Sequence, residues 1–285
     1  MSRRLGGLFQ SIVLATLATF GNAWFSPAPA AGLPRIASMN VCTDQLLVPL
    51  ADPQQIVGLS RFSRDGWQSS SGDARRFPVL SGGAEDLLVL KPDIVVASLF
   101  DKRSTRELLK ENGVHLVEFA VPRNLDEVKA DIRAMGEIVQ HPDRAAAEIA
   151  RLDASVARAR LAVADKHYRV LPLSRRGWVS GSDSFVSSVL TETGLFNAAG
   201  DLGVASGGFA SLEAIVNLKP DFILVSQAGD HARDEGQAFL LHPALERFYP
   251  PSKRIVIPEW LTECGSVMLA EALDVLVAEL PRVRR

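Results

Sequence analysis

The sequence contains the segment EDLLVLKPDIVVAS at residues 85–98 and a related segment, EAIVNLKPDFILVS, at residues 213–226. The two copies share the first glutamate, the Leu-Lys-Pro-Asp tetrapeptide and the final serine. In each copy the proline prevents a helix from continuing and biases the preceding lysine towards extended backbone. The apolar run that follows has the length of a strand buried on both faces. A repeat of this kind in the two halves of the chain predicts two similar lobes.

The sequence around each copy alternates between strand-like and helix-like patterns. In the first half we expect strands at residues 35–39, 56–59, 94–97 and 114–119, with helices at residues 44–50 and 105–112 and Gly113 ending the second helix. In the second half we expect strands at residues 169–173, 222–225 and 254–257, with helices at residues 184–193, ending at Gly194, and 269–280. Alternating strands and helices form parallel sheets with right-handed crossovers. The predicted fold is therefore α/β, with two Rossmann-like lobes and parallel sheets.

A long amphipathic pattern separates the two halves. After His141-Pro142, apolar residues recur every three or four positions, at Ala145, Ile149, Leu152, Val156, Ala159 and Val163. A helix of about 23 residues is roughly 34 Å long, enough to run along both lobes. We expect one connecting helix, although a surface helix of a single lobe would show the same pattern. The predicted organisation is an N-terminal lobe at residues 31–140, a connecting helix at 141–165 and a C-terminal lobe at 166–285.

The first 30 residues have the pattern of a signal peptide. Arg3 and Arg4 precede an apolar run at residues 8–20, and a small-residue stretch follows at residues 27–31. The alternative is a membrane anchor, but the run is shorter than the roughly 20 apolar residues that a span requires. The sequence therefore predicts a soluble protein exported to the periplasm after cleavage of residues 1–30.

Composition and motifs exclude several classes of function. The 285 residues carry a formal net charge of -2, which gives no electrostatic reason to expect a nucleic-acid partner. The five histidines show no ligand spacing, so we expect no bound zinc or manganese. The chain lacks the G-x-S-x-G and G-x-G-x-x-G motifs, and we predict no enzyme, no catalytic residue and no resident cofactor. An exported α/β hydrolase is the enzymatic alternative.

Taken together, these features resemble the class III, helical-backbone periplasmic binding proteins of ABC importers. The resemblance rests on Arg35-Ile36-Ala37-Ser38 at the first strand, both Leu-Lys-Pro-Asp segments, the connecting helix and His242-Pro243-Ala244-Leu245 before the last strand. It implies a monomeric protein that captures a metal chelate between its lobes: a ferric siderophore, cobalamin or a haem-like ligand. A periplasmic cofactor sensor or chaperone without a transport role is the alternative.

The resemblance also implies a docking device. In this family a surface glutamate on each lobe contacts arginines of the ABC permease, and the repeat assigns this role to Glu85 and Glu213. A glutamate in the first turn of a helix also stabilises that helix by about 0.3–1 kcal/mol, which is the plain structural explanation.

Candidate ligand-binding residues come from loops after the strands, because ligands of parallel α/β folds lie beyond the carboxyl ends of the strands. Aromatic rings provide a rigid contact surface, and arginines pair with the carboxylates of an anionic chelate. The predicted ligand-binding residues are Cys42, Phe62, Arg64, Trp67, Phe100, Arg176, Trp178, Phe209, Trp260 and Cys264.

Some residues of the predicted pocket differ from those of the cobalamin-binding members of this family. Phe62 matches an aromatic position of their pocket, but Val79 and Gly207 occupy positions where those proteins carry tryptophans. These differences count against cobalamin itself, and a siderophore or another metal chelate is equally compatible with the sequence.

The two cysteines follow the first and the last strand, so we expect both side chains to face the cleft from opposite lobes. A disulfide requires Cα atoms within about 7 Å, which the loops reach only if they lean together. A disulfide, two free thiols and two thiolates that contact a metal of the ligand all remain open.

Overall fold

Four short strands form the first sheet. The computed structural model describes residues 32–64, 72–164, 166–226 and 235–283. Strands β1 (Ile36–Ser38), β2 (Ile56–Gly58), β3 (Ile94–Ser98) and β4 (Leu116–Phe119) pair in parallel in the order β2-β1-β3-β4. The central strands β1 and β3 are almost fully buried, as expected of a parallel sheet covered on both faces. The predicted signal peptide lies outside the described residues.

Four helices accompany this sheet, and we call the sheet with these helices the N-lobe. They are α1 (Val41–Leu50), α2 (Ala84–Leu90), α3 (Arg103–Glu111) and α4 (Leu125–Ile138). The sequence analysis did not predict α4, although Leu125, Val128, Ile132 and Met135 follow helical spacing and are all buried. The side chain of Asn124 caps this helix by accepting a hydrogen bond from the Glu127 N–H.

A second parallel sheet has the order β10-β9-β5-β7. Its strands are β5 (Arg169–Pro172), β7 (Phe196–Asn197), β9 (Phe222–Val225) and β10 (Arg254–Val256). The helices of this half are α6 (Phe185–Thr193), α7 (Leu212–Leu218), α8 (Glu235–Ala238), α9 (Pro243–Phe248), α10 (Glu259–Thr262) and α11 (Leu269–Glu279). We call this half the C-lobe. The predicted α/β class with two parallel sheets is confirmed.

The C-lobe also contains an antiparallel pair that the sequence analysis did not predict. Strands β6 (Trp178–Ser180) and β8 (Gly207–Phe209) form a separate two-stranded sheet in which Trp178 lies opposite Phe209. The two predicted parallel sheets are present, and this antiparallel pair is an addition to them. Each strand has three residues and β8 contains two glycines, so neither carries a readable alternation.

The two Leu-Lys-Pro-Asp segments form the same local structure. Lys91 and Lys219 end α2 and α7 in the left-handed conformation, with φ of 46° and 50°. The expected extended backbone at these lysines is therefore wrong, although the proline still disfavours continuation of the helix. The Asp93 carboxylate accepts a hydrogen bond from the Arg35 N–H at 2.7 Å, and the Asp221 carboxylate accepts one from the Arg169 N–H at 2.9 Å. The repeat thus fixes the start of the neighbouring strand in each lobe.

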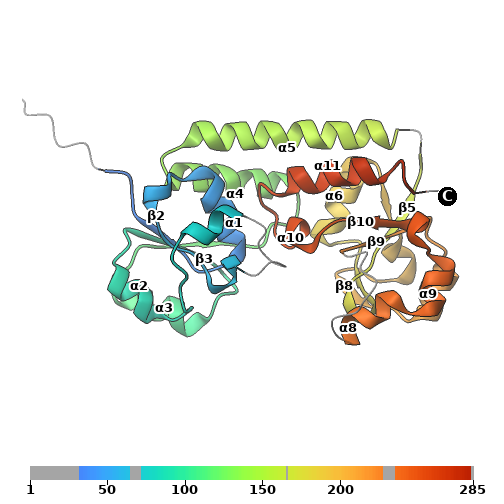
Figure 1. The fold of residues 1–285 in the computed structure, drawn as a ribbon, viewed down its shortest axis with the longest axis horizontal. Helices are drawn as coiled ribbons and strands as arrows, with labels where there is room; N and C mark the ends of the chain where they lie inside the picture. Colours follow the sequence, from blue (N-terminus) through green and yellow to red (C-terminus); the bar gives the residue numbers. More distant parts are fainter. Residues whose placement is uncertain (1–31, 65–71, 165, 227–234, 284–285) are drawn as a thin grey trace, which may run out of the picture. The chain divides into compact units, whose positions relative to one another are not determined.

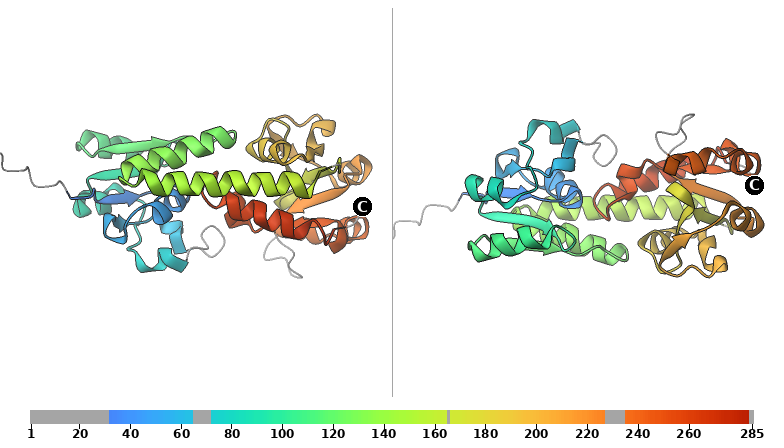
Figure 2. Two further views of the ribbon diagram at one scale, coloured as in Figure 1. Left: turned by 90° about the horizontal axis from the view of Figure 1, so that it is seen from above. Right: turned by 90° about the horizontal axis from the view of Figure 1, so that it is seen from below.

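The helix between the two sheets is α5 (Pro142–Ala162). It packs against α4 of the N-lobe and against α6 and α11 of the C-lobe, as Figures 1 and 2 show. One hydrophobic cluster contains Leu47 of the N-lobe, Leu152 of α5 and Leu273 of the C-lobe. The connecting helix therefore shares a continuous core with both halves. Within the described ranges, no helix combines the length and the apolar character that crossing a membrane requires.

Candidate functional site

The loop after β3 presents an exposed aromatic ring at the carboxyl edge of the N-lobe sheet. Phe100 is 80% exposed. The loop is fixed by Asp101, whose carboxylate accepts hydrogen bonds from the Ser98 N–H at 2.8 Å and from Asn40 Nδ2 at 3.1 Å. Asn40 in turn caps α1 by accepting a hydrogen bond from the Cys42 N–H. The loops after β1 and β3 are therefore held together.

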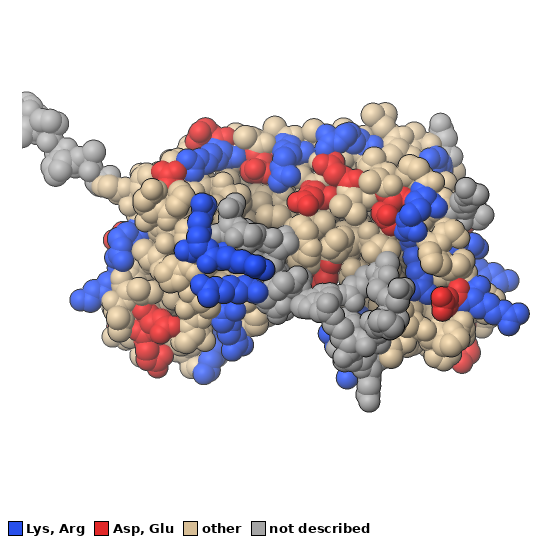
Figure 3. All heavy atoms as spheres, in the orientation of Figure 1, with Lys and Arg blue, Asp and Glu red and all other residues tan. Residues whose placement is uncertain are grey.

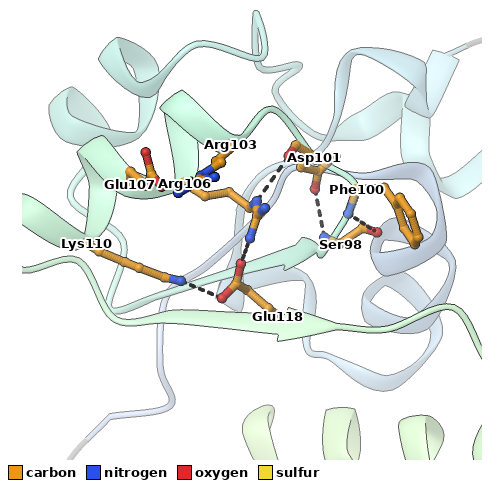
Figure 4. Close-up of polar contacts among 8 residues, drawn as sticks. All are labelled: Ser98, Phe100, Asp101, Arg103, Arg106, Glu107, Lys110 and Glu118. Atoms are coloured by element: carbon orange, nitrogen blue, oxygen red, sulfur yellow. Dashed lines mark hydrogen bonds and ion pairs between the residues drawn. The ribbon is translucent and has the colours of Figure 1, made fainter.

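A charged cluster supports the same loop from behind. Arg106 donates a hydrogen bond to the Asp101 carbonyl at 3.0 Å and forms an ion pair with Glu118, which also pairs with Lys110 at 2.6 Å. Hydrogen bonding to Lys110 is the main reason why the pKa of Glu118 lies below its usual value, and Arg106 adds to the effect. In Figure 4 the Phe100 ring points away from these contacts. The cluster fixes the loop and leaves the ring free.

A buried carboxylate holds the loop after β2. Asp44 accepts hydrogen bonds from the Ser60 N–H at 3.1 Å and from Ser60 Oγ at 2.6 Å. Burial raises the pKa of the Asp44 carboxyl to about 6, although hydrogen bonds with Ser38 and Ser60 oppose the shift. Ser60 leads into the 3-10 turn η2 (Arg61–Arg64), which carries two predicted site residues. Phe62 is half-buried beneath the Arg61 guanidinium, and Arg64 is exposed.

The two lobes are joined covalently at their facing edges. Cys42 at the start of α1 forms a disulfide with Cys264 after α10, with a Cα–Cα distance of 5.3 Å. Gln45 of α1 donates a hydrogen bond to the Trp260 carbonyl at 3.0 Å and accepts one from Ser266 Oγ at 2.6 Å. We call this set of contacts the lobe junction. Of the three alternatives left open by the sequence, the structure contains the disulfide.

The disulfide forms because the segment around Cys264 approaches the N-lobe closely. A Cβ atom at Gly265 would lie 2.3 Å from Pro122 Cγ and 3.0 Å from Val128 Cγ2. Cys264 is buried, and both sulfurs are bonded to each other. The alternatives of two free thiols and of two thiolates that contact a metal are therefore wrong.

Two aromatic rings lie together on the C-lobe. Trp178 and Phe209 face each other across β6 and β8 in an edge-to-face arrangement, with ring centroids 5.1 Å apart. Both remain substantially exposed, at 40% and 68%. A Cβ atom at Gly207 would lie 2.6 Å from the Trp178 ring, so the glycine allows the indole to approach the backbone closely. Gly207 is thus covered by Trp178.

The remaining predicted site residues lie in different surroundings. Arg176 is exposed in the turn η4 (Arg175–Gly177), with a φ of 56°. Trp260 is partly buried against the main core, and its carbonyl belongs to the lobe junction. Trp67 lies outside the described residues. Glu85 and Glu213 are both exposed in the first turns of α2 and α7.

Sequence reasoning did not single out the residues that position the loops. Asn40, Asp44, Ser60 and Asp101 make the decisive hydrogen bonds. Asp44 has a sequence signal, because it is the only charged residue of α1.

The C-lobe contains a cavity of about 100 Å³ between its sheet and two helices. Residues at the ends of β5 and β9, including Leu173 and Ser226, line it together with apolar side chains of α6 and α11. In the part of the chain that the structure describes, no group of three or more His, Cys, Asp or Glu residues could hold a metal ion.

Comparisons with known proteins agree with this architecture. A curated cobalamin-binding protein of Halobacterium salinarum is 26% identical over 206 residues, which cover 69% of this chain and 54% of that protein. The match thus spans about half the length of the curated relative. Among solved structures, a periplasmic heme-binding protein from Roseiflexus sp. RS-1 has a TM-score of 0.69 at 24% identity, covering 89% of this chain and all of that one.

Two further solved structures have the same fold. The periplasmic heme-binding protein HutB of Vibrio cholerae has a TM-score of 0.71 at 19% identity, covering 87% of this chain and 98% of that one. An ABC-type Fe3+-hydroxamate transport protein from Saccharomonospora viridis has a TM-score of 0.65 at 20% identity, covering 86% and 92%. The similarity to these solved structures is a similarity of fold. The sequence profile of the periplasmic binding protein family matches residues 36–249, most of the described chain. The resemblance seen in the sequence is thereby confirmed, and the chain belongs to the periplasmic binding protein family.

Proposed function

We propose that this protein is the solute-binding component of an ABC importer and captures a metal chelate between its two lobes. The observation that carries the proposal is the exposure of large aromatic rings at both facing edges: Phe100 on the N-lobe, and Trp178 with Phe209 on the C-lobe. Exposed rings of this size, fixed by their own loops, are suited to the flat face of a chelate or macrocycle. Relatives whose names specify cobalamin, heme and Fe3+-hydroxamate support this ligand class.

The proposed site combines residues of both lobes. Phe62, Arg64 and Phe100 face the ligand from the N-lobe, and Arg176, Trp178, Phe209 and Trp260 from the C-lobe. The Cys42–Cys264 disulfide, which joins the two lobes, is proposed as the floor of this site. Trp67 is proposed as a further contact on its sequence position alone. Because α5 and the lobe junction both connect the lobes, we expect a modest change of cleft angle on binding.

The test is a binding screen with the mature protein, residues 31–285. Cyanocobalamin, cobinamide, haem, ferric citrate and ferrioxamine B are each added in excess, and thermal unfolding is recorded. A ligand at 100 times its dissociation constant adds about 2.7 kcal/mol of stability, a readily visible shift. A 1:1 complex with one of these compounds, recovered chemically unchanged, is the expected result. No shift with any of them, or turnover of the compound, would contradict the proposal.

We also propose that Glu85 and Glu213 dock the loaded protein onto the permease. Both are exposed at equivalent positions of the repeat. Glu85→Arg and Glu213→Arg should abolish uptake in cells and leave chelate affinity unchanged, because surface charges act on partner association. Glu271→Arg is the matched control, an exposed glutamate in the first turn of α11. A loss of chelate affinity in Glu85→Arg would instead assign that residue to the ligand site.

Export and oligomeric state belong to the same proposal. We expect residues 1–30 to be removed during export to the periplasm and the mature protein to be a monomer. N-terminal sequencing of the periplasmic protein and light scattering of the purified protein test these two expectations.

A further inference from the structure

Four arginines on two neighbouring turns of the N-lobe lack the carboxylate partners that several other arginines of the described chain have. Arg106, Arg144, Arg158 and Arg282 each pair with a carboxylate. Within the described ranges, no such partner contacts the arginines of η2 and η3 (Gly72–Arg76): Arg61, Arg64, Arg75 and Arg76, all exposed. An arginine without a protein carboxylate keeps its planar set of N–H donors available to an oxyanion.

Three of the four guanidinium groups are held in place by other contacts. Arg61 stacks over the Phe62 ring at 4.7 Å, and Arg76 stacks over the Phe77 ring at 5.0 Å. Arg64 Nη2 donates a hydrogen bond to the Phe77 carbonyl at 3.3 Å, which joins η2 to η3. Stacking uses the face of a guanidinium and leaves its edge free for bidentate hydrogen bonds. We call this set the arginine surface.

The arginine surface lies beside the lobe junction. Ser60 immediately precedes η2 and is held by Asp44 of α1. Cys42, two residues before Asp44, is bonded to Cys264 of the C-lobe. Figure 3 shows Lys and Arg side chains gathered on the N-terminal half of this face beside the grey atoms, and a second group at the far end of the C-terminal half, whereas blue and red alternate along α5. A ligand that contacts this edge of the N-lobe would therefore meet the positive charge of Arg61, Arg64, Arg75 and Arg76.

We propose that the arginine surface selects a chelate that carries free carboxylates in addition to the groups that hold its metal. This inference rests on the proposed function and narrows the ligand class within it. Two or more carboxylates can pair with different guanidinium groups, and each charge-assisted pair adds affinity that a neutral or cationic chelate cannot obtain. Binding is accordingly expected to weaken as salt is raised, because these pairs are exposed.

The experiment compares four chelates on the wild-type protein and two double variants. Ferric citrate and haem carry free carboxylates; ferrioxamine B and cyanocobalamin do not. Arg64→Gln/Arg76→Gln removes two members of the arginine surface, one from each turn. Arg133→Gln/Arg247→Gln is the control with the same change of net charge, at exposed arginines without an ion pair among the described residues. Dissociation constants are measured by calorimetry at low and at high salt, and thermal unfolding verifies that every variant is folded.

We expect a carboxylate-bearing chelate to bind best and to lose affinity with rising salt. Arg64→Gln/Arg76→Gln should lower the affinity for that chelate by at least about tenfold, while the affinity of the control variant stays within about twofold of the wild type. Two results would overturn the inference alone and leave the proposed function standing: tighter binding of ferrioxamine B or cyanocobalamin, or equal effects of the two double variants. If none of the four chelates binds, the inference and the proposed function both fail.

Discussion

At the scale of single residues, the clearest feature is the aspartate that each Leu-Lys-Pro-Asp segment contributes to the strand beside it. Asp93 and Asp221 accept the N–H of Arg35 and Arg169, respectively. The arginine side chains return to the end of the same segments: Arg35 donates to the Lys91 carbonyl at 2.7 Å and Arg169 to the Lys219 carbonyl at 3.2 Å. The sequence repeat is therefore a repeat of hydrogen bonds between a helix end and a strand start.

Asp221→Ala should lower the free energy of unfolding by about 1–3 kcal/mol, since it leaves the partly buried Arg169 N–H without its acceptor. Asp201→Ala is the control. It removes only the exposed carboxylate that pairs with the Arg169 guanidinium, and should cost about 1 kcal/mol at most. Urea unfolding of the two variants measures the difference. Equal losses would mean that the backbone hydrogen bond has no special role.

Asp44 predicts a pH dependence of stability. Its pKa of about 6 in the folded protein lies above the ordinary value of 3.8, so between these values the folded state binds more protons than the unfolded state. Stability therefore falls as the pH rises through this window and levels off above about pH 6, a loss of about 3 kcal/mol. Asp44→Asn does not titrate. The stability of the wild type relative to Asp44→Asn, measured by urea unfolding from pH 4 to pH 7, should fall accordingly. A constant difference would contradict the assigned pKa.

At the scale of elements, the sequence predicted the strands and helices that have a clear hydrophobic pattern and clear residues at their ends. Strand β9 was predicted with its observed bounds, because a Pro-Asp stop precedes a short apolar run. Helix α6 was predicted to within one residue, because Ser184 caps its start and Gly194 its end. The pair β6 and β8 could not be predicted, since two strands of three residues carry no period. Their pairing nevertheless brings Trp178 to Phe209.

Gly207→Ala tests how this pair is built. The new methyl group would lie within 2.6 Å of the Trp178 ring, at a backbone φ of 155°, so the indole must move or β8 must separate from β6. We expect a loss of about 1–3 kcal/mol of stability and a changed tryptophan emission spectrum. Gly208→Ala, whose methyl group meets only Val204 at 3.5 Å, should be close to neutral. The same spectrum for wild type and Gly207→Ala would show that Trp178 lies elsewhere.

At the scale of the whole molecule, the two lobes share a core along α5 and are bonded through Cys42 and Cys264. The connecting helix was visible in the sequence from its apolar stripe. The disulfide was not, because the separation of two cysteines in sequence says nothing of their distance in space. The close approach that permits it depends on α4, through Val128, and on Gly265, and neither was recognised in the sequence.

The double variant Cys42→Ser/Cys264→Ser should be less stable by about 2–5 kcal/mol, because the bond closes a long loop in the unfolded chain. Urea unfolding with and without reductant measures this. Reductant should reduce the stability of the wild type to that of the double variant and leave the variant unchanged. Insensitivity of the wild type to reduction under unfolding conditions would contradict a bond between the lobes.

The central claim is that one chelate is held between the facing edges of both lobes, and one calorimetric titration tests it directly. Phe100 lies in the loop after β3 of the N-lobe, Phe209 lies on β8 of the C-lobe, and both are exposed. Phe100→Ala and Phe209→Ala should each lower the affinity for the same chelate by about tenfold at an unchanged 1:1 stoichiometry. Phe248→Ala, an exposed ring at the end of α9, should have no effect. Full affinity in either Phe100→Ala or Phe209→Ala would contradict a site shared by the two lobes.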